Sequence, residues 1–138
     1  MRLTADEARE RLAGARVTRL ATLTPGGRPH IVPVTFAVDG DLIYTAVDAK
    51  PKSTTDLRRL RNIAAHPAVA LLADHYDDDW SNLWWARADG DASVLTDDAA
   101  MANPVALLAG RYPQYAGGPP GGPVIAIRVS RWTGWSAT

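Results

Sequence analysis

A cluster of basic residues in the middle of the chain has the composition of an anion-binding site. Between Lys50 and Arg61 the chain carries five cationic side chains and one acid, Asp56, so the surplus is five minus one, or four charges, in a protein of zero formal net charge. The cations are Lys50, Lys52, Arg58, Arg59 and Arg61. Such a group can hold a phosphate or carboxylate. A solvated basic helix face would have the same composition, so both interpretations stay open here.

The same stretch carries the start signal of a helix. Ser53 and Asp56 form an S-x-x-D pattern, in which Ser53 caps the helix and Asp56 reaches back to its backbone. The unpaired N–H groups and the helix dipole favour an anion at that end, beside Lys50 and Lys52, although Asp56 competes for the same donors. Helical spacing places one set of residues toward the core, namely Leu57, Leu60, Ile63 and Ala64. The flanks and outer face then hold Arg58, Arg59, Arg61 and Asn62.

Other arrangements of catalytic or ligand-binding residues are poorly represented. The sequence has no G-x-G-x-x-G, no P-loop and no G-x-S-x-G, and it has no cysteine for a disulfide, a thiolate ligand or a nucleophile. The histidines, His30, His66 and His75, lie far apart without metal-ligand spacing. The acidic stretch Asp74–Asp79 lacks the glycine and the following glutamate of a calcium loop. We therefore expect no metal site there, and a solvated hairpin tip instead.

Length and charge limit the class of protein. A chain of 138 residues suits one domain, residues 1–138, which can bury roughly two-thirds of its unfolded surface. Zero net charge argues against nucleic acid as the main partner. No apolar run reaches the roughly 18 residues of a membrane span, and the charged N-terminus is unlike a signal peptide. These features predict a soluble, cytoplasmic protein that does not bind membranes.

The elements that must position the basic cluster are mostly strands. A capping box, Thr4 with Glu7, predicts a helix over residues 5–13. Strands are expected over 17–24, 28–38, 41–47, 68–73, 83–95 and 124–129. Asn103-Pro104 predicts that residues 96–111 form two short helices. The segment Tyr112–Pro123 holds four Pro and four Gly, so it is irregular, and its tyrosines could fold over a site as a flap.

Two details of the strands bear on a ligand. In the stretch 28–38, Val32, Val34 and Phe36 alternate with smaller residues at 33, 35 and 37, and that second face could admit a flat ligand. Pro33 removes a ladder donor, which favours an edge or a bulge, and Gly90 marks a possible bulge in strand 83–95. All five Trp residues follow position 79, which indicates an aromatic surface or pocket in the second half.

About six strands joined mainly by hairpins, with a few helices, fit a mainly β (α+β) fold. The pattern favours a small antiparallel barrel with peripheral helices over a doubly wound sheet, and a closed barrel would leave no free edge.

From about Arg16 to the C-terminus the chain also resembles a known family, the pyridoxamine-phosphate-oxidase-like split barrels of the flavin and deazaflavin oxidoreductase superfamily. The likeness is carried by the order and spacing of K-P-K-S-T, D-H-Y-D-D-D-W-x-x-L-W-W-x-R and W-T-G-W. This combination is similar to the actinobacterial subgroup of coenzyme F420-dependent enzymes. The phosphate-binding motif of the oxidase subfamily resembles S-R-K, whereas this chain has K-P-K-S. This departure argues against FMN and pyridoxamine phosphate as its ligands.

The resemblance implies a homodimer with a flat tricyclic cofactor, F420 or alternatively FMN, in a groove between subunits. It implies an anionic tail held by Lys50, Lys52 and Ser53, and less directly by Arg58 and Arg61, with Arg59 on the solvated face. Ring contacts would come from Pro33, Val34, Thr35, Tyr44 and Thr45. Contacts across the dimer, or alternatively dimer core, would come from Trp80, Trp85, Arg87 and Trp132.

The chemistry implied is hydride transfer between reduced F420 and a small conjugated or heteroaromatic acceptor. No catalytic side chain is assigned, because the cofactor carries that chemistry. Two alternatives remain open: a non-catalytic carrier of flavin, deazaflavin or tetrapyrrole, and an FMN-dependent enzyme like pyridoxamine-phosphate oxidase.

Overall fold

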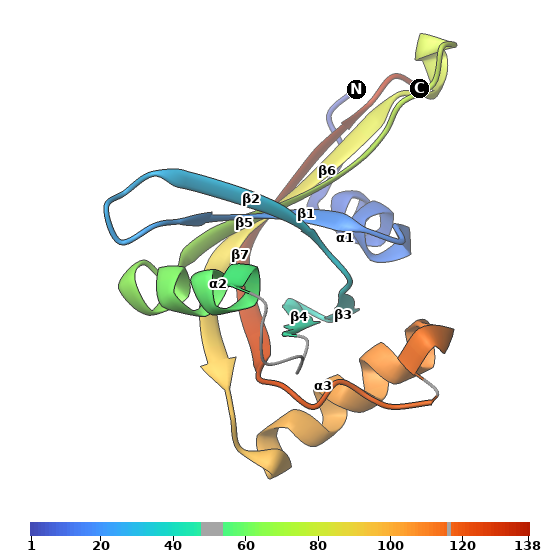
Figure 1. The fold of residues 1–138 in the computed structure, drawn as a ribbon. Coiled ribbons are helices and arrows are strands. Elements are labelled where there is room, and N and C mark those ends of the chain that lie inside the picture. Colours follow the sequence, from blue (N-terminus) through green and yellow to red (C-terminus); the bar gives the residue numbers. More distant parts are fainter. Residues whose placement is uncertain (48–53, 116) are drawn as a thin grey trace.

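The computed structural model describes residues 1–47, 54–115 and 117–138, with the backbone alone for residues 54–57. The described residues form seven strands and three α-helices (Figure 1). The helices are α1 (Ala5–Gly14), α2 (Thr54–Ala65) and α3 (Asp98–Arg111), with short 3-10 turns η1 (Trp80–Asn82) and η2 (Pro113–Tyr115). The strands are β1 (Thr18–Leu23), β2 (Pro29–Val34), β3 (Ala37–Asp39), β4 (Leu42–Ala46), β5 (Ala68–His75), β6 (Trp84–Leu95) and β7 (Val124–Ser136).

The strands form one antiparallel sheet whose two edges are joined by a very short connection. The strand order is β2-β1-β5-β6-β7-β4-β3, so β2 and β3 are the edges. Yet β2 ends at Val34 and β3 begins at Ala37. Because a residue spans at most about 3.6 Å of extended chain, two residues cannot bridge an open seven-stranded sheet. The sheet must roll until its edges meet at Thr35 and Phe36, which confirms the predicted split antiparallel barrel.

The break between β2 and β3 corrects the single strand predicted over 28–38 and raises the strand count from about six to seven. Its cause is a side chain that is remote in sequence. The Phe36 backbone N–H donates to the Tyr112 hydroxyl (3.0 Å), and that hydroxyl also lies 3.1 Å from the Phe36 carbonyl oxygen. Phe36 therefore bonds to a tyrosine in place of a neighbouring strand.

The expectation that the barrel leaves no edge is also wrong, because β2 and β3 do not pair in the described chain.

The core lies inside the rolled sheet and beneath α1. Fully buried Leu20, Ile43, Leu71 and Ile127 come from four different strands. The predicted capping box of α1 is present: Glu7 N donates to Thr4 Oγ1 (3.2 Å), and Thr4 N donates to Glu7 Oε1 (2.8 Å). Capping fixes the entry of a helix whose Ala8 and Leu12 are fully buried with Leu3 in the main core. None of the described helices is both long and apolar enough to span a membrane.

Residues 98–111 form one helix, α3, and not the two short helices that Asn103-Pro104 predicted. Pro104 lies inside α3 and is buried. A proline removes one hydrogen bond from a helix and its ring crowds the carbonyl four residues earlier, and tertiary contacts of the C-terminal half of α3 offset this cost. Leu108 is fully buried against Ala37 and Tyr112. At the end of α3, Arg111 donates to the carbonyl oxygens of Ala13 and Ala15, which ties the helix to the end of α1.

Strands β5, β6 and β7 continue past the barrel as an arm with η1 at its tip, close to both chain termini (Figure 1). The predicted bulge occurs between Asp89 and Gly90 in the β6–β7 pairing. A Cβ on Gly90 would lie 2.3 Å from the Arg128 carbonyl oxygen, so glycine is required there. The C-terminal strand is longer than predicted and runs unbroken through Trp135.

Candidate functional site

A small pocket lies where the two sheet edges meet, beneath the segment that follows α3. Its volume is about 230 Å³. It is lined from the β2–β3 junction by Pro33, Val34 and Thr35, from β4 by Thr45 and Ala46, from α2 by Arg59, and from the irregular segment by Tyr115 and Pro120. We call this the edge pocket. Whole-ligand pockets usually measure about 300–1,000 Å³, so this one suits one end of a larger ligand.

Arg59 is the only charged side chain among the described residues lining the edge pocket, and it was predicted to be solvated. That prediction is wrong: Arg59 is 8% exposed, and Asn62 is 1% exposed. Residues 59, 62 and 63 share one helical face, and this face packs toward β1, where Asn62 Nδ2 donates to Thr22 Oγ1 (3.0 Å). Ala64, predicted to be core, is exposed. The buried face of α2 is thus rotated by about one residue from the face that the apolar residues alone predicted.

The Thr45 hydroxyl gives the edge pocket a second polar group. Thr45 is 1% exposed, and its Oγ1 has no hydrogen-bond partner among the described residues. Buried polar side chains nearly always have a partner, so such an atom in a pocket wall is suited to a ligand. A guanidinium and a hydroxyl donor together match the oxygen atoms of a phosphate or carboxylate. The residues present therefore fit an anionic group.

Two tyrosines fix the wall of the edge pocket. The Tyr115 hydroxyl lies 3.1 Å from Thr35 Oγ1, and Tyr112 is held by its bonds to Phe36. The two rings meet edge to face, with centroids 6.1 Å apart. Tyr115 and Pro120, from the irregular segment after α3, thus line the pocket, in line with the flap that the tyrosines of that segment predicted. This cover limits the access of water to Thr45 and Arg59.

The predicted ring-contact residues do not all lie on one side of the barrel. Pro33, Val34, Thr35 and Thr45 line the edge pocket. Tyr44 instead lines a separate hollow of about 430 Å³ that includes Leu42 and Arg128. This follows from strand geometry, because neighbouring residues on β4 point to opposite faces.

The predicted tail-binding residues divide in a different way. Arg58 and Arg61 are exposed on the side of α2 away from the sheet. Lys50, Lys52 and Ser53, together with the Ser53–Asp56 cap, lie outside the described residues. The described chain thus brings Arg59, and not its two neighbouring arginines, to the edge pocket.

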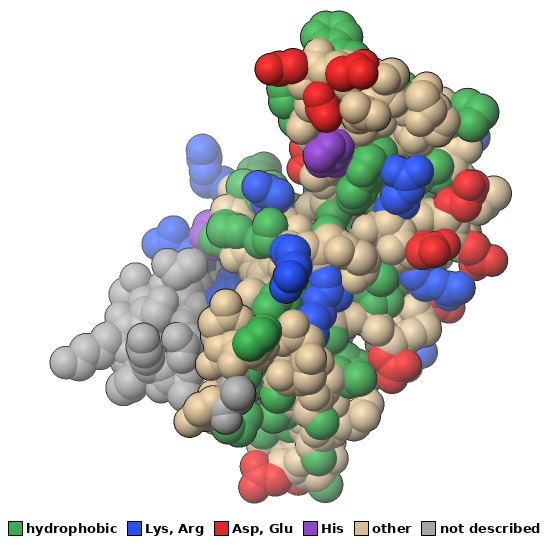
Figure 2. Space-filling model, turned by 90° about the vertical axis from the view of Figure 1, so that its right-hand side faces the viewer, with side chains coloured by type: hydrophobic (Ala, Val, Ile, Leu, Met, Phe, Trp, Pro, Cys, Tyr) green, Lys and Arg blue, Asp and Glu red, His purple; other side chains and the backbone are tan. Residues whose placement is uncertain are grey.

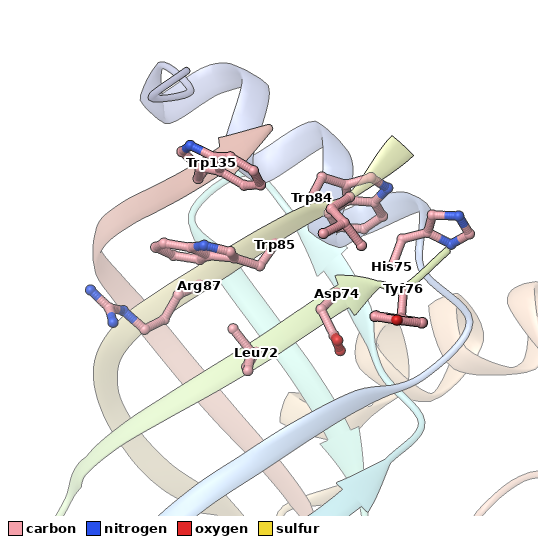
Figure 3. A pocket seen from close by; sticks show the side chains of 9 residues that line it. Leu72, Asp74, His75, Tyr76, Trp84, Trp85, Arg87 and Trp135 are labelled. Atoms are coloured by element: carbon pink, nitrogen blue, oxygen red, sulfur yellow. The ribbon is translucent and has the colours of Figure 1, made fainter. Parts of the chain in front are cut away.

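The predicted aromatic contacts lie on the arm, and within one chain they do not reach the edge pocket. Trp80 is 69% exposed in η1 at the tip. Trp85 and Arg87 line a hollow of about 450 Å³ with Leu72 and Trp135 (Figure 3). We call this the arm hollow. The Arg87 guanidinium lies 5.5 Å from the centre of the Trp85 ring and 3.3 Å from Asp89.

Trp132 has a contact of another kind, because its Nε1 donates to Asp41 Oδ1 (2.9 Å). This bond links β7 to the turn before β4, a structural role within the chain. None of the four predicted arm residues therefore contributes to the edge pocket of its own subunit.

The acidic stretch forms the tip of the arm, as predicted. Asp79 caps η1: the Ser81 hydroxyl and the Ser81 backbone N–H donate to its carboxylate and hold the pKa of Asp79 below its ordinary value. No three His, Asp or Glu side chains of the described residues are grouped as a metal would require. Acidic side chains gather at the tip, and basic side chains form a band across the middle of the same face (Figure 2).

Sequence reasoning missed Arg59 as a lining residue, although one signal was available. Arg59 stands at i−3 and i−4 from Asn62 and Ile63, so a polar residue and an apolar residue already shared its face. The buried face of α2 was assigned from its apolar residues alone, and this placed Arg59 outside. Arginine is rarely buried without a partner or ligand, so exposure was the default expectation.

The chain matches one protein family. A family model described as pyridoxamine 5'-phosphate oxidase matches residues 4–136. Among curated proteins, no match to the chain is found.

Several solved structures share the fold at low sequence identity. A conserved hypothetical protein from Mycobacterium tuberculosis is 21% identical, with a TM-score of 0.79, over 98% of this chain and 86% of that one. An FAD-binding protein from Mesorhizobium loti is 20% identical, with a TM-score of 0.72, over 97% and 95%. A heme-binding protein from Mycobacterium smegmatis is 20% identical, with a TM-score of 0.72, over 96% of this chain and 57% of that one.

Proposed function

Since the chain belongs to the pyridoxamine 5'-phosphate oxidase family, we propose that it is an oxidoreductase that binds coenzyme F420 and reduces a small conjugated or heteroaromatic acceptor. The observation that carries the proposal is the edge pocket, whose wall holds both the buried Arg59 and the Thr45 hydroxyl, which has no hydrogen-bond partner among the described residues. The preference for F420 over FMN rests on the K-P-K-S motif and the tryptophan-rich motifs of the sequence.

In this proposal the residues of the edge pocket bind and orient the anionic end of the cofactor. The planar guanidinium of Arg59 donates hydrogen bonds to the oxygen atoms of that anionic end, and the Thr45 hydroxyl donates another from the pocket wall. Lys50, Lys52 and Ser53 come shortly before α2 in the sequence, and in this proposal the two lysines contribute positive charge, and Ser53 a hydroxyl, to binding that end. Pro33, Val34 and Thr35 offer a strand edge against which a flat ring can lie.

The protein has to supply orientation and a dry environment more than reactive side chains. When bound, the reduced cofactor supplies a hydride, and an acceptor that takes this hydride and a proton from water is reduced by two electrons. Tyr115 and Pro120 exclude water from the pocket, and the bond between Tyr115 and Thr35 keeps that cover in place.

The proposal includes a homodimer, supported by the outward face of the sheet. Ile31 is 63% exposed, Trp135 37% and Leu72 36%. Strand register puts these residues on one face, where charges are largely paired through Arg19 with Asp74 and Arg87 with Asp89. A neutral, partly apolar face suits a second copy of the chain. In such a dimer Trp80, Trp85, Arg87 and Trp132 of the arm are the groups available to complete the partner's site.

A second candidate is a carrier that binds a flavin, deazaflavin or tetrapyrrole without catalysis. It is favoured by the likeness of the fold to the FAD-binding and heme-binding proteins above. A carrier and a reductase need the same cofactor pocket, so that pocket does not distinguish them.

A ligand titration followed by a turnover assay distinguishes the reductase from the carrier. The purified protein is titrated with F420, FMN, FAD and haem, and we expect F420 to bind most tightly. Turnover of reduced F420 is then followed with nitroaromatic and enone acceptors. Tight F420 binding with turnover supports the reductase, and tight binding without turnover supports the carrier. Tighter binding of FMN, FAD or haem than of F420 would overturn the cofactor assignment.

A further inference from the structure

A second cavity adjoins the edge pocket on the other side of the Tyr115 wall. Its volume is about 520 Å³, and it is lined by Arg16, Thr35, Tyr112, Gln114 and Tyr115. We call it the tyrosine pocket. It shares Thr35 and Tyr115 with the edge pocket, so the bonded pair of these side chains forms a common wall. Ligands placed on the two sides of that wall would lie next to each other.

The aromatic rings of the tyrosine pocket are held in fixed positions. The Tyr112 hydroxyl lies 3.0 Å from the Arg16 carbonyl oxygen as well as being bonded to Phe36, and the Tyr115 hydroxyl is bonded to Thr35. With both hydroxyls occupied, the rings meet the cavity with their apolar surfaces. Rings fixed nearly perpendicular, at 81°, provide a face and an edge for a flat guest. These surfaces favour an aromatic or conjugated ligand.

Among the described residues, no acid pairs with the positive charges near this pocket. Arg16 is exposed at its rim and makes no ion pair with a carboxylate of the described residues. Arg111 lies 5.6 Å from the centre of the Tyr112 ring and donates to the backbone carbonyl oxygens of Ala13 and Ala15, which leaves its charge without a carboxylate. Gln114 adds an amide. The charge balance selects an anionic ligand over a cationic one.

We propose that the tyrosine pocket is the acceptor site and that it takes a flat aromatic or conjugated carboxylate, with the carboxylate at Arg16 and the ring against Tyr112 and Tyr115. This inference rests on the proposed function, because only a cofactor in the edge pocket makes the neighbouring cavity an acceptor site. Hydride transfer needs the reacting atoms about 3–3.5 Å apart. The tyrosine pocket includes Thr35, one of the residues against which the cofactor ring is proposed to lie, so an acceptor in this cavity would lie beside the ring.

The test uses 2-naphthoate as the probe and 2-naphthalenemethanol as its neutral counterpart, with binding followed by calorimetry on the full chain without cofactor. We expect naphthoate to bind more tightly than the alcohol. Arg16→Gln should weaken naphthoate roughly tenfold, the loss expected for one charge-assisted hydrogen bond, and should leave the alcohol unchanged. Arg28→Gln, a matched change of an exposed arginine in the β1–β2 turn, should change neither.

A second measurement separates this inference from the proposed function. Naphthoate is titrated in the presence of saturating F420, and we expect both ligands to bind together. Competition between them would show that one ligand occupies both cavities, and would overturn an acceptor site here. Equal naphthoate affinity in the parent and Arg16→Gln would also overturn it. Failure of F420 to bind while naphthoate still binds would remove the proposed function and leave the tyrosine pocket as an aromatic-acid site.

Discussion

At the scale of single residues, the proposed function depends on a cation and a hydroxyl that are both largely buried. Arg59 and Thr45 come from α2 and β4, and both line a pocket of about 230 Å³. A guanidinium presents its donors in a fixed planar fork, so its position in the wall of a pocket suits an anionic ligand. The exposed arginines on either side of it, Arg58 and Arg61, lack that setting.

One residue-scale prediction concerns the cap of α1. Hydrogen bonds from the Thr4 backbone and side chain lower the pKa of Glu7 below its ordinary value. A carboxyl whose pKa is lowered on folding stabilises the protein above its unfolded-state pKa, and loses that effect as pH falls through its folded-state pKa. We therefore expect the difference in melting temperature between the parent and Glu7→Gln to shrink from neutral pH into acid. A difference that stays constant over that range would show that the charge of Glu7 has no part in the cap.

At the same scale, sequence reasoning predicted one part of the site and missed the other. The strand residues Pro33, Val34, Thr35 and Thr45 were assigned through resemblance, and the structure brings them together. The burial of Arg59 was missed, because it depends on which face of α2 lies against β1, and that is decided by tertiary contacts such as the one from Asn62 to Thr22.

At the scale of elements, most helices and strands follow from local patterns, and the exceptions have tertiary causes. The capping box of α1 and the Gly90 bulge were both readable, since each is fixed by neighbouring residues. The division of β2 from β3 was not readable, because Tyr112, which bonds to Phe36, stands far away in the sequence. The unbroken α3 was not readable either, because tertiary contacts of its C-terminal half, at Leu108 and Arg111, outweigh Pro104.

The element-scale prediction concerns the β6–β7 bulge. Gly90→Ala places a Cβ within 2.3 Å of the Arg128 carbonyl oxygen, so the two strands must separate. We expect a loss of about 1–3 kcal/mol of unfolding free energy, measured by urea denaturation. Gly110→Ala in α3 is the matched control, since its Cβ meets nothing within 4 Å. This control should be neutral or stabilising by up to about 1 kcal/mol. Equal stability of the parent and Gly90→Ala would contradict the bulge geometry.

At the scale of the whole molecule, the short link between β2 and β3 closes the barrel and creates the edge pocket in the same place. A list of strands does not reveal this closure, because it depends on strand order, and the order places the consecutive strands β2 and β3 at opposite edges. The other half of the proposed groove depends on a second copy of the chain. Within one chain the aromatic residues of the arm lie away from the edge pocket, so they could complete that site only in the proposed dimer.

The whole-molecule prediction concerns the dimer. Leu72 lies on the outward sheet face between Arg19 and Arg87, its partners on the neighbouring strands. Leu72→Lys therefore places a positive charge between two others, on a face that the proposed dimer buries. We expect the parent to sediment as a dimer and Leu72→Lys as a monomer, while Ala102→Lys, on the exposed side of α3, should remain a dimer. A monomeric parent at micromolar concentration would contradict the interface.

The measurement that tests the central claim most directly compares two arginines on the same helix. F420 is titrated against the parent, Arg59→Gln and Arg61→Gln, with melting temperatures recorded to establish that each variant is folded. Because Arg59 lines the edge pocket and Arg61 faces solvent, we expect Arg59→Gln to weaken binding about 10- to 100-fold and Arg61→Gln to leave it near the parent value. Arg59→Lys, which keeps the charge, should recover part of the loss. A folded Arg59→Gln variant that binds F420 as tightly as the parent would contradict the assignment of the edge pocket as the cofactor's anion site.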